Sequence, residues 1–129
     1  MILLMKTDQA EAYVGLHDGN EYVAETHWQA HRELSDTLLK AIESELHALD
    51  ADWSDLTGVG IFKGPGSFTG LRIGMTVANT LSQSLGIPIV ATQEDSWAEA
   101  ALERLSNNET DTIAMPEYGG EANITKPRK

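Results

Sequence analysis

Two short apolar stretches, each followed directly by a helical pattern, restrict the possible folds of this chain more than any other feature. Residues 56–62 and 86–92 are apolar and partly β-branched, which is typical of buried strands. A helix is expected from about residue 67 to 85 after the first stretch, and another at residues 94–106 after the second. Strands that alternate with helices pair in parallel, and the helices cover the sheet. The second half of the chain is therefore predicted to form a parallel α/β layer.

The first half of the chain carries the signals of an antiparallel hairpin and a long helix. Residues 2–5 are continuously apolar, as in a buried strand, and residues 12–17 and 21–28 flank an Asp-Gly turn signal. Residues 30–49 place leucines on one side and charged residues on the other, which predicts an amphipathic helix of about five turns. We therefore expect an α/β domain with a mixed sheet, in the order β-β-β-α-β-α-β-α, followed by a weak hairpin.

The chain of 129 residues is long enough for one domain with its own core. No repeat or linker interrupts the first 106 residues. We assign residues 1–111 to this domain and residues 112–129 to a short hairpin and a basic tail. The hairpin is expected from a Gly-Gly pair, Gly119 and Gly120, that lies between two strand-like runs.

The composition limits the classes of partner and chemistry. The chain has no cysteine, which excludes disulfides and zinc sites built on thiolates. Its net charge is −11, and such a surface repels phosphates, so any nucleic acid is expected to be contacted through a basic partner. The apolar run at the N-terminus is too short for a membrane span or a signal peptide, so we expect a cytoplasmic protein without membrane contact.

The stretch "KGPGSFTGLRIG", residues 63–74, places glycines in a loop and again inside the following helix. A strand, a glycine turn and a helix N-terminus together resemble an anion-binding arrangement. The possible phosphate loop consists of Gly64, Pro65, Gly66 and Ser67. It lacks the Lys-Ser/Thr ending of a Walker motif and the Gly-x-Gly-x-x-Gly pattern. The alternative is a simple chain reversal in which Ser67 caps the helix.

The helix after this loop has an unusually wide apolar face. Gly70, Gly74 and Ala78 fall on one side, and the apolar arc extends over roughly 200°, about twice what a sheet requires. Small residues at this spacing form a groove that another helix can enter. The occupant is either the helix of residues 30–49 or a second chain. For the second case the expected interface residues are Leu34, Leu38, Gly70, Leu71, Gly74, Met75 and Ala78.

Other candidate chemistry is weak in this sequence. His27 and His31 have the i, i+4 spacing of zinc-binding helices, but His27 falls in a predicted strand. The chain also lacks a nucleophile-elbow motif. We therefore expect no metal site, no cofactor and no catalytic residue.

The residues "GPGSFTGLRIGMTVANTLSQSLGIPIVAT", Gly64 to Thr92, closely resemble the signature of the TsaB (YeaZ) family. The opening "ILLMKTDQAEAYVGLHDG" is similar to that family's first hairpin, and "LSDTLLKAIESEL" to its first helix. The resemblance covers about residues 2–106.

This resemblance implies an actin-like, ribonuclease-H-like lobe and a role in forming threonylcarbamoyladenosine on tRNA. In that system a paralogous transferase, TsaD, performs the reaction, and TsaB pairs with it through its helices without catalysing the transfer. A TsaE ATPase joins them, and tRNA contact by TsaB is indirect. The group is also called glycoprotease-like or M22 peptidase-like. By resemblance we expect a TsaD-like partner, possibly a TsaE-like one, and a homodimer in isolation.

The chain departs from the family pattern in ways that affect this expectation. It has Lys6-Thr7 where the family usually has Asp-Thr, which argues against Mg-ATP chemistry. The usual second lobe is nearly missing, so we expect a truncated member that consists of the first lobe. Two alternatives stay open: a nucleotide-binding or hydrolytic enzyme that uses the glycine loop, and a pseudo-enzyme that only self-associates.

Overall fold

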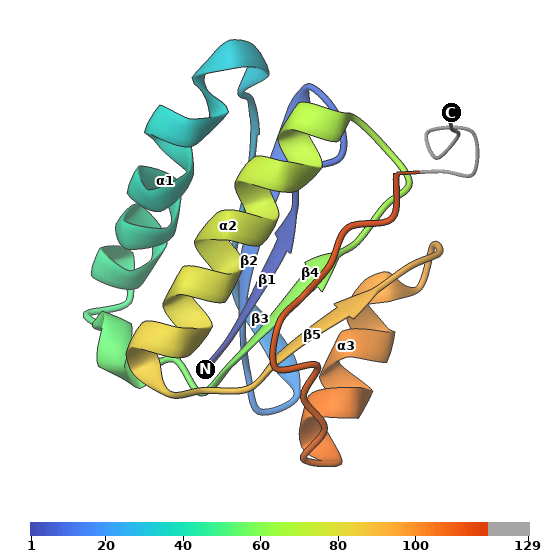
Figure 1. The fold of residues 1–129 in the computed structure, drawn as a ribbon. Helices are drawn as coiled ribbons and strands as arrows, with labels where there is room; N and C mark the ends of the chain where they lie inside the picture. The colour runs from blue at the N-terminus through green and yellow to red at the C-terminus, as the bar shows by residue number, and fades with distance from the viewer. Residues whose placement is uncertain (119–129) are drawn as a thin grey trace.

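The computed structural model of the chain describes residues 1–118, which form a five-stranded sheet with helices on both faces (Figure 1). The strand order is β3-β2-β1-β4-β5. β1 pairs antiparallel with β2, β2 antiparallel with β3, and β1, β4 and β5 are parallel. The strands are β1 (Ile2–Lys6), β2 (Glu11–Asp18), β3 (Glu21–Gln29), β4 (Gly58–Phe62) and β5 (Ile89–Thr92). The helices are α1 (Leu34–Ala48), α2 (Phe68–Leu85) and α3 (Trp97–Ser106), with 3-10 turns at His31–Glu33 and Trp53–Asp55. The predicted fold class and element order are confirmed.

Local signals explain where the elements begin and end. The β2–β3 turn contains Gly19 with φ of 68°, a conformation that glycine adopts without a steric penalty. The hydroxyl of Ser67 caps α2 by accepting from the amide of Gly70, at 3.3 Å. Gly86 ends the same helix in the left-handed conformation. Both ends of α2 are therefore set by residues that the sequence identifies.

The two faces of the sheet form two separate cores. Leu3 and Met5 point toward α1 and α2, whereas Leu4 points toward α3. On the α3 side, Gly60 of β4 allows close packing, because a Cβ there would lie 2.7 Å from the Cβ of Ala101. α3 packs on β4 and β5, so it leaves the outward side chains of β2 and β3 uncovered.

Most of the wide apolar face of α2 is covered by the chain itself. Besides the sheet and α1, the segment after α3 returns along α2 (Figure 1, red) and buries Ala114. The side chain of Asn79 both accepts from the amide of Ala114, at 2.8 Å, and donates to its carbonyl, at 3.0 Å. As predicted, the sheet alone does not cover the apolar arc of α2. The segments that cover more of it, α1 and the residues after α3, belong to the same chain rather than to a partner.

The segment after α3 also closes the outer edge of the sheet at β5. The amide of Asp111 donates to Ile89 O, and the Asp111 carboxylate accepts from the amide of Ala91. Arg104 holds that carboxylate in an ion pair. An open strand edge would expose unpaired amide groups, so these contacts protect it.

The predicted C-terminal hairpin begins in this segment. Residues 112–118 contain no strand, because their backbone bonds go to α2 and to the loop at Lys63 rather than to a neighbouring strand. The first arm of the hairpin therefore differs from the prediction. Its turn at Gly119-Gly120, its second arm and the basic tail lie outside the described residues. Among residues 1–118, no helix is both long and apolar enough to cross a lipid bilayer.

Candidate functional site

Three loops converge at the carboxyl ends of the parallel strands. The turn after β1 contains Thr7 and Asp8, the loop after β4 is the glycine loop, and residues 93–96 follow β5. Ligands of open α/β sheets bind at this edge, so it is the first place to look for a site.

The glycine loop packs tightly on the turn after β1. The amide of Ser67 donates to Asp8 O, at 2.7 Å, and a Cβ on Gly66 would lie 2.5 Å from the Cβ of Asp8. Gly64, with φ of 117°, lies against the carbonyl of Glu117. The loop glycines therefore allow backbone to approach backbone within the chain.

These contacts bear on the phosphate prediction for Gly64, Pro65, Gly66 and Ser67. One amide at the start of α2, that of Ser67, is already used by Asp8 O. The Cβ and backbone carbonyl of Asp8 pack against Gly66, so the turn after β1 occupies that side of the loop. Phosphate binding stays a prediction that this geometry does not favour.

The helix glycines fit the side chain of Thr7. Thr7 is fully buried, and its hydroxyl donates to the carbonyl of Gly70, at 2.9 Å. A Cβ on Gly70 would overlap Thr7 O, and a Cβ on Gly74 would overlap Thr7 Oγ1. Gly70 and Gly74 therefore leave the space on α2 into which Thr7, the residue after β1 of the same chain, packs.

The residues predicted to contact a second chain are mostly interior. Six of the seven are buried by this chain's own atoms: Leu34, Leu38, Leu71, Gly74, Met75 and Ala78. The seventh, Gly70, is half-buried against Thr7. The small residues at 70, 74 and 78 therefore do not form an open groove in the structure. Partner binding itself stays a prediction, and other residues of α1 and α2 would have to mediate it.

The solvent side of α1 and α2 provides such residues. A groove of about 380 Å³ between the helices is lined by Ser35, Thr69, Arg72, Ile73, Thr76 and Val77. On α1, Leu39 lies one turn beyond Ser35 and is 45% exposed. We call these seven residues the outer helix face.

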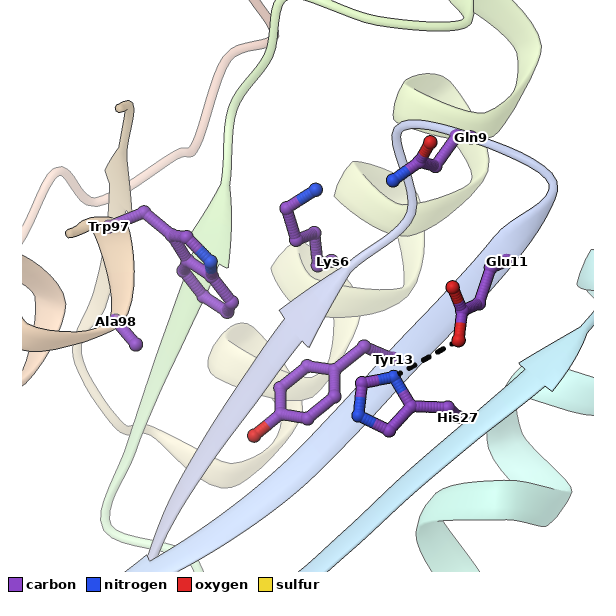
Figure 2. A pocket seen from close by; sticks show the side chains of 7 residues that line it. All are labelled: Lys6, Gln9, Glu11, Tyr13, His27, Trp97 and Ala98. Carbon is purple, nitrogen blue, oxygen red and sulfur yellow. Dashed lines mark ion pairs between the residues drawn. The ribbon is translucent and has the colours of Figure 1, made fainter. Parts of the chain in front are cut away.

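A second concave region lies on the opposite face of the sheet (Figure 2). We call it the aromatic pocket; its volume is about 270 Å³ and it is lined by Lys6, Gln9, Glu11, Tyr13, His27, Trp97 and Ala98. Tyr13 lies edge-on to Trp97, with ring centroids 6.1 Å apart, and 4.9 Å from His27. The side chains come from β1, the β1–β2 turn, β2, β3 and α3, and they surround a common space in Figure 2.

Most charged groups around this pocket already have a partner. Lys6 Nζ lies 2.8 Å from Asp8 Oδ1 and 4.5 Å from the centroid of the Phe62 ring. Burial raises the pKa of Tyr13, and the hydrogen bond that its hydroxyl donates to Glu25, at 2.8 Å, raises it further. Tyr13 is therefore a neutral donor at physiological pH. Glu11 Oε2 makes a longer contact, 3.4 Å, to His27 Nδ1.

The sequence reasoning did not find the aromatic pocket. The alternation in β2 places Glu11 and Tyr13 on one face, and the hairpin register brings His27 opposite Tyr13. The strand alternation and the Asp-Gly turn were enough to predict that Glu11, Tyr13 and His27 lie together. The position of Trp97, at the start of α3, could not be predicted in this way, because it depends on how that helix packs on the sheet.

No group of three or more His, Asp or Glu side chains within residues 1–118 is placed to hold a metal ion. His27, the candidate ligand, lies on β3 beside Glu11.

Comparison with known proteins identifies the family. The family model described as TsaD, tRNA N6-adenosine threonylcarbamoyltransferase, matches residues 28–112, which is more than half of the chain. The chain belongs to this family. Curated relatives support the resemblance to the TsaB (YeaZ) family: the tRNA threonylcarbamoyladenosine biosynthesis protein TsaB of Bacillus subtilis is 49% identical over 53 residues, 41% of this chain. The Buchnera aphidicola protein of the same name is 33% identical over 72 residues, 56% of this chain.

The similar solved structures share the fold of this chain. YeaZ from Pseudomonas aeruginosa superposes with a TM-score of 0.69 over 81% of this chain, at 23% identity. The matches cover 23% and 33% of the two curated proteins and 49% of the YeaZ chain, so this chain spans about half of that structure.

Proposed function

We propose that this chain is a non-catalytic partner in the formation of threonylcarbamoyladenosine on tRNA and that it binds and stabilises a TsaD-like transferase. The observation that carries the proposal is the family match over residues 28–112, together with curated relatives whose names place them in that pathway. Because the net charge is −11, tRNA is contacted through the partner rather than by this chain. The proposed location is the cytoplasm, where tRNA is modified.

The outer helix face is the proposed contact surface for the transferase. It combines a groove with the apolar side chains of Ile73, Val77 and Leu39, and its charged member is Arg72. Protein interfaces have an apolar centre with arginine enriched and a polar rim, and this face matches that pattern. The opposite sides of the same helices are buried in the core, so they hold the face rigid.

Lys6 supports a partner role over a catalytic one. It occupies the end of β1 and places an ammonium group against Asp8 and the Phe62 ring. That arrangement places a cation, already paired with Asp8, at the edge where the three parallel strands end. A TsaE-like ATPase is proposed as a further member of the complex, bound through the transferase.

Co-purification tests this proposal. The chain and the TsaD-like transferase of the same organism are co-expressed, with a tag on the transferase. The wild-type chain is expected to co-purify, and Ile73→Asp on the outer helix face to be lost from the complex while it stays folded. Glu43→Arg, an exposed change elsewhere on α1, serves as the matched control. Failure of the wild-type chain to co-purify under gentle conditions contradicts the proposal.

Calorimetry distinguishes this function from nucleotide binding at the glycine loop. The partner role predicts no heat of binding from ATP or ADP with magnesium. A dissociation constant below about 10 µM, near −7 kcal/mol, would favour the enzyme alternative. Light scattering of the isolated chain tests self-association.

A further inference from the structure

The aromatic pocket faces away from the outer helix face, and the proposed function does not use it. It adjoins a second hollow of about 420 Å³, with which it shares Lys6 and Trp97. The second hollow is also lined by Asp8, Glu94 and Asp95. The two hollows meet at Lys6 and Trp97, and we refer to them together as the groove.

The charge of this groove selects a cation. Within the described residues that line it, the basic side chains are Lys6, which Asp8 neutralises at 2.8 Å, and His27, which lies 3.4 Å from Glu11. The other acidic side chains are Glu94 and Asp95, so carboxylates outnumber the basic groups. Glu94 and Asp95 are exposed, and the Glu11 side chain is half exposed. The ammonium of Lys6 therefore does not turn the groove into an anion site.

The aromatic walls narrow the choice of cation. The ring of Tyr13 borders the pocket and Trp97 closes its far side, while His27 stands beside Tyr13 (Figure 2). A guanidinium group stacks on an aromatic face and binds a carboxylate through two parallel N–H groups, whereas a lysine ammonium is a point charge that stays hydrated. Glu11 lies across the pocket from Trp97 and beside His27 (Figure 2), and its half-exposed carboxylate can accept those hydrogen bonds.

We propose that the aromatic pocket binds an arginine side chain from a basic segment of a partner protein. Tyr13 provides the aromatic surface for the guanidinium and Glu11 its carboxylate. Glu94 and Asp95, in the adjoining hollow, attract the basic residues that flank the arginine. This interaction lies on the side of the sheet opposite the proposed transferase contact, so both can occur at once.

NMR spectroscopy of the ¹⁵N-labelled full chain tests the proposal. The probe is N-acetyl-arginine amide, and N-acetyl-citrulline amide is the uncharged control of the same shape. The arginine probe is expected to shift the indole N–H signal of Trp97 with saturation in the millimolar range, and citrulline to leave it unchanged. The indole of Trp28 donates to Thr37 on the other side of the sheet, so its signal should stay fixed.

Variants of the chain test which carboxylate contributes to binding of the arginine probe. Glu11→Gln should weaken the arginine probe about fivefold, the effect of one half-exposed ion pair. Glu21→Gln, an exposed change at the β2–β3 turn, is the matched control and should bind as the wild type does. A five-residue glycine–serine peptide with a central arginine should bind at least as tightly as the single residue.

Four results would overturn the proposal. They are an equal Trp97 shift with citrulline, no saturable shift with either arginine probe, unchanged affinity in Glu11→Gln, and a Trp97 shift caused by inorganic phosphate. Weaker binding of the peptide than of the single residue would indicate a site for a free organic cation instead of a protein segment. None of these results depends on the proposed role in tRNA modification.

Discussion

Replacement of Gly74 by alanine tests the internal packing that sets α2 against the sheet. The added Cβ would overlap Thr7 Oγ1 and would lie 3.2 Å from Thr7 Cβ and 3.3 Å from Ile61 Cδ1. Thr7 is fully buried and its hydroxyl is bonded to Gly70 O, so it has no free direction in which to move. The helix must shift away from the sheet or Thr7 must leave its rotamer.

Two opposing terms set the magnitude. Alanine is more favourable than glycine inside a helix by about 1 kcal/mol. Overpacking of a closed core costs about 1–3 kcal/mol, and the overlap with a fixed side chain places this case near the upper value. The net expectation is a loss of about 2 kcal/mol, which lowers the melting temperature of a domain of this size by roughly 8 °C. Gly74→Leu is expected to unfold the domain.

Thermal and urea denaturation of four proteins provide the assay: wild type, Gly74→Ala, Thr7→Ala and the double variant. Removing the Thr7 hydroxyl relieves the worst overlap, so the double variant should be more stable than Gly74→Ala by about 1–2 kcal/mol. Thr76→Ala, on the exposed side of α2, is the control for helix propensity. A rise in melting temperature for Gly74→Ala, or no rescue by Thr7→Ala, would refute the reasoning.

Two further substitutions test the electrostatics of the fold. The Glu45 carboxylate is buried; burial raises its pKa from 4.5 to about 7, although the nearby Thr26 side chain lowers it in part. Stability should therefore fall as pH rises from about 4.5 to 7, by about 3 kcal/mol, and urea titrations of Glu45→Gln should lack that decline. Burial alone would raise the pKa of Asp111, but the hydrogen bonds from Arg104 and the amide of Ala91 outweigh it and lower the pKa. Asp111→Ala should cost about 1–2 kcal/mol in urea, because it leaves that amide unpaired, and an unchanged midpoint would show that the segment after α3 does not stabilise β5.

The local pattern of the sequence was enough to predict the elements and their order. Strand and helix periods, the Asp-Gly turn, the Ser67 cap and the Gly86 terminator each depend on residues within a few positions of one another. The fold class follows from them, because alternating strands and helices leave few ways to build a sheet.

Contacts between distant residues could not be predicted in the same way. The width of the apolar arc on α2 correctly indicated a second cover, but not its source. Thr7 is 63 positions from Gly70, and Ala114 is 35 positions from Asn79. Periodicity reports which side of a helix is buried and contains no information on which segment buries it. The aromatic pocket was missed for the same reason, since Trp97 joins it only through the packing of α3.

Hydrogen–deuterium exchange of the chain with and without the TsaD-like transferase tests the central claim most directly. Binding through the outer helix face predicts slower exchange in peptides from α1 and α2, and unchanged exchange in α3, which lies on the other side of the sheet. The absence of protection in α1 and α2 at saturating transferase, or protection confined to α3, would contradict the account.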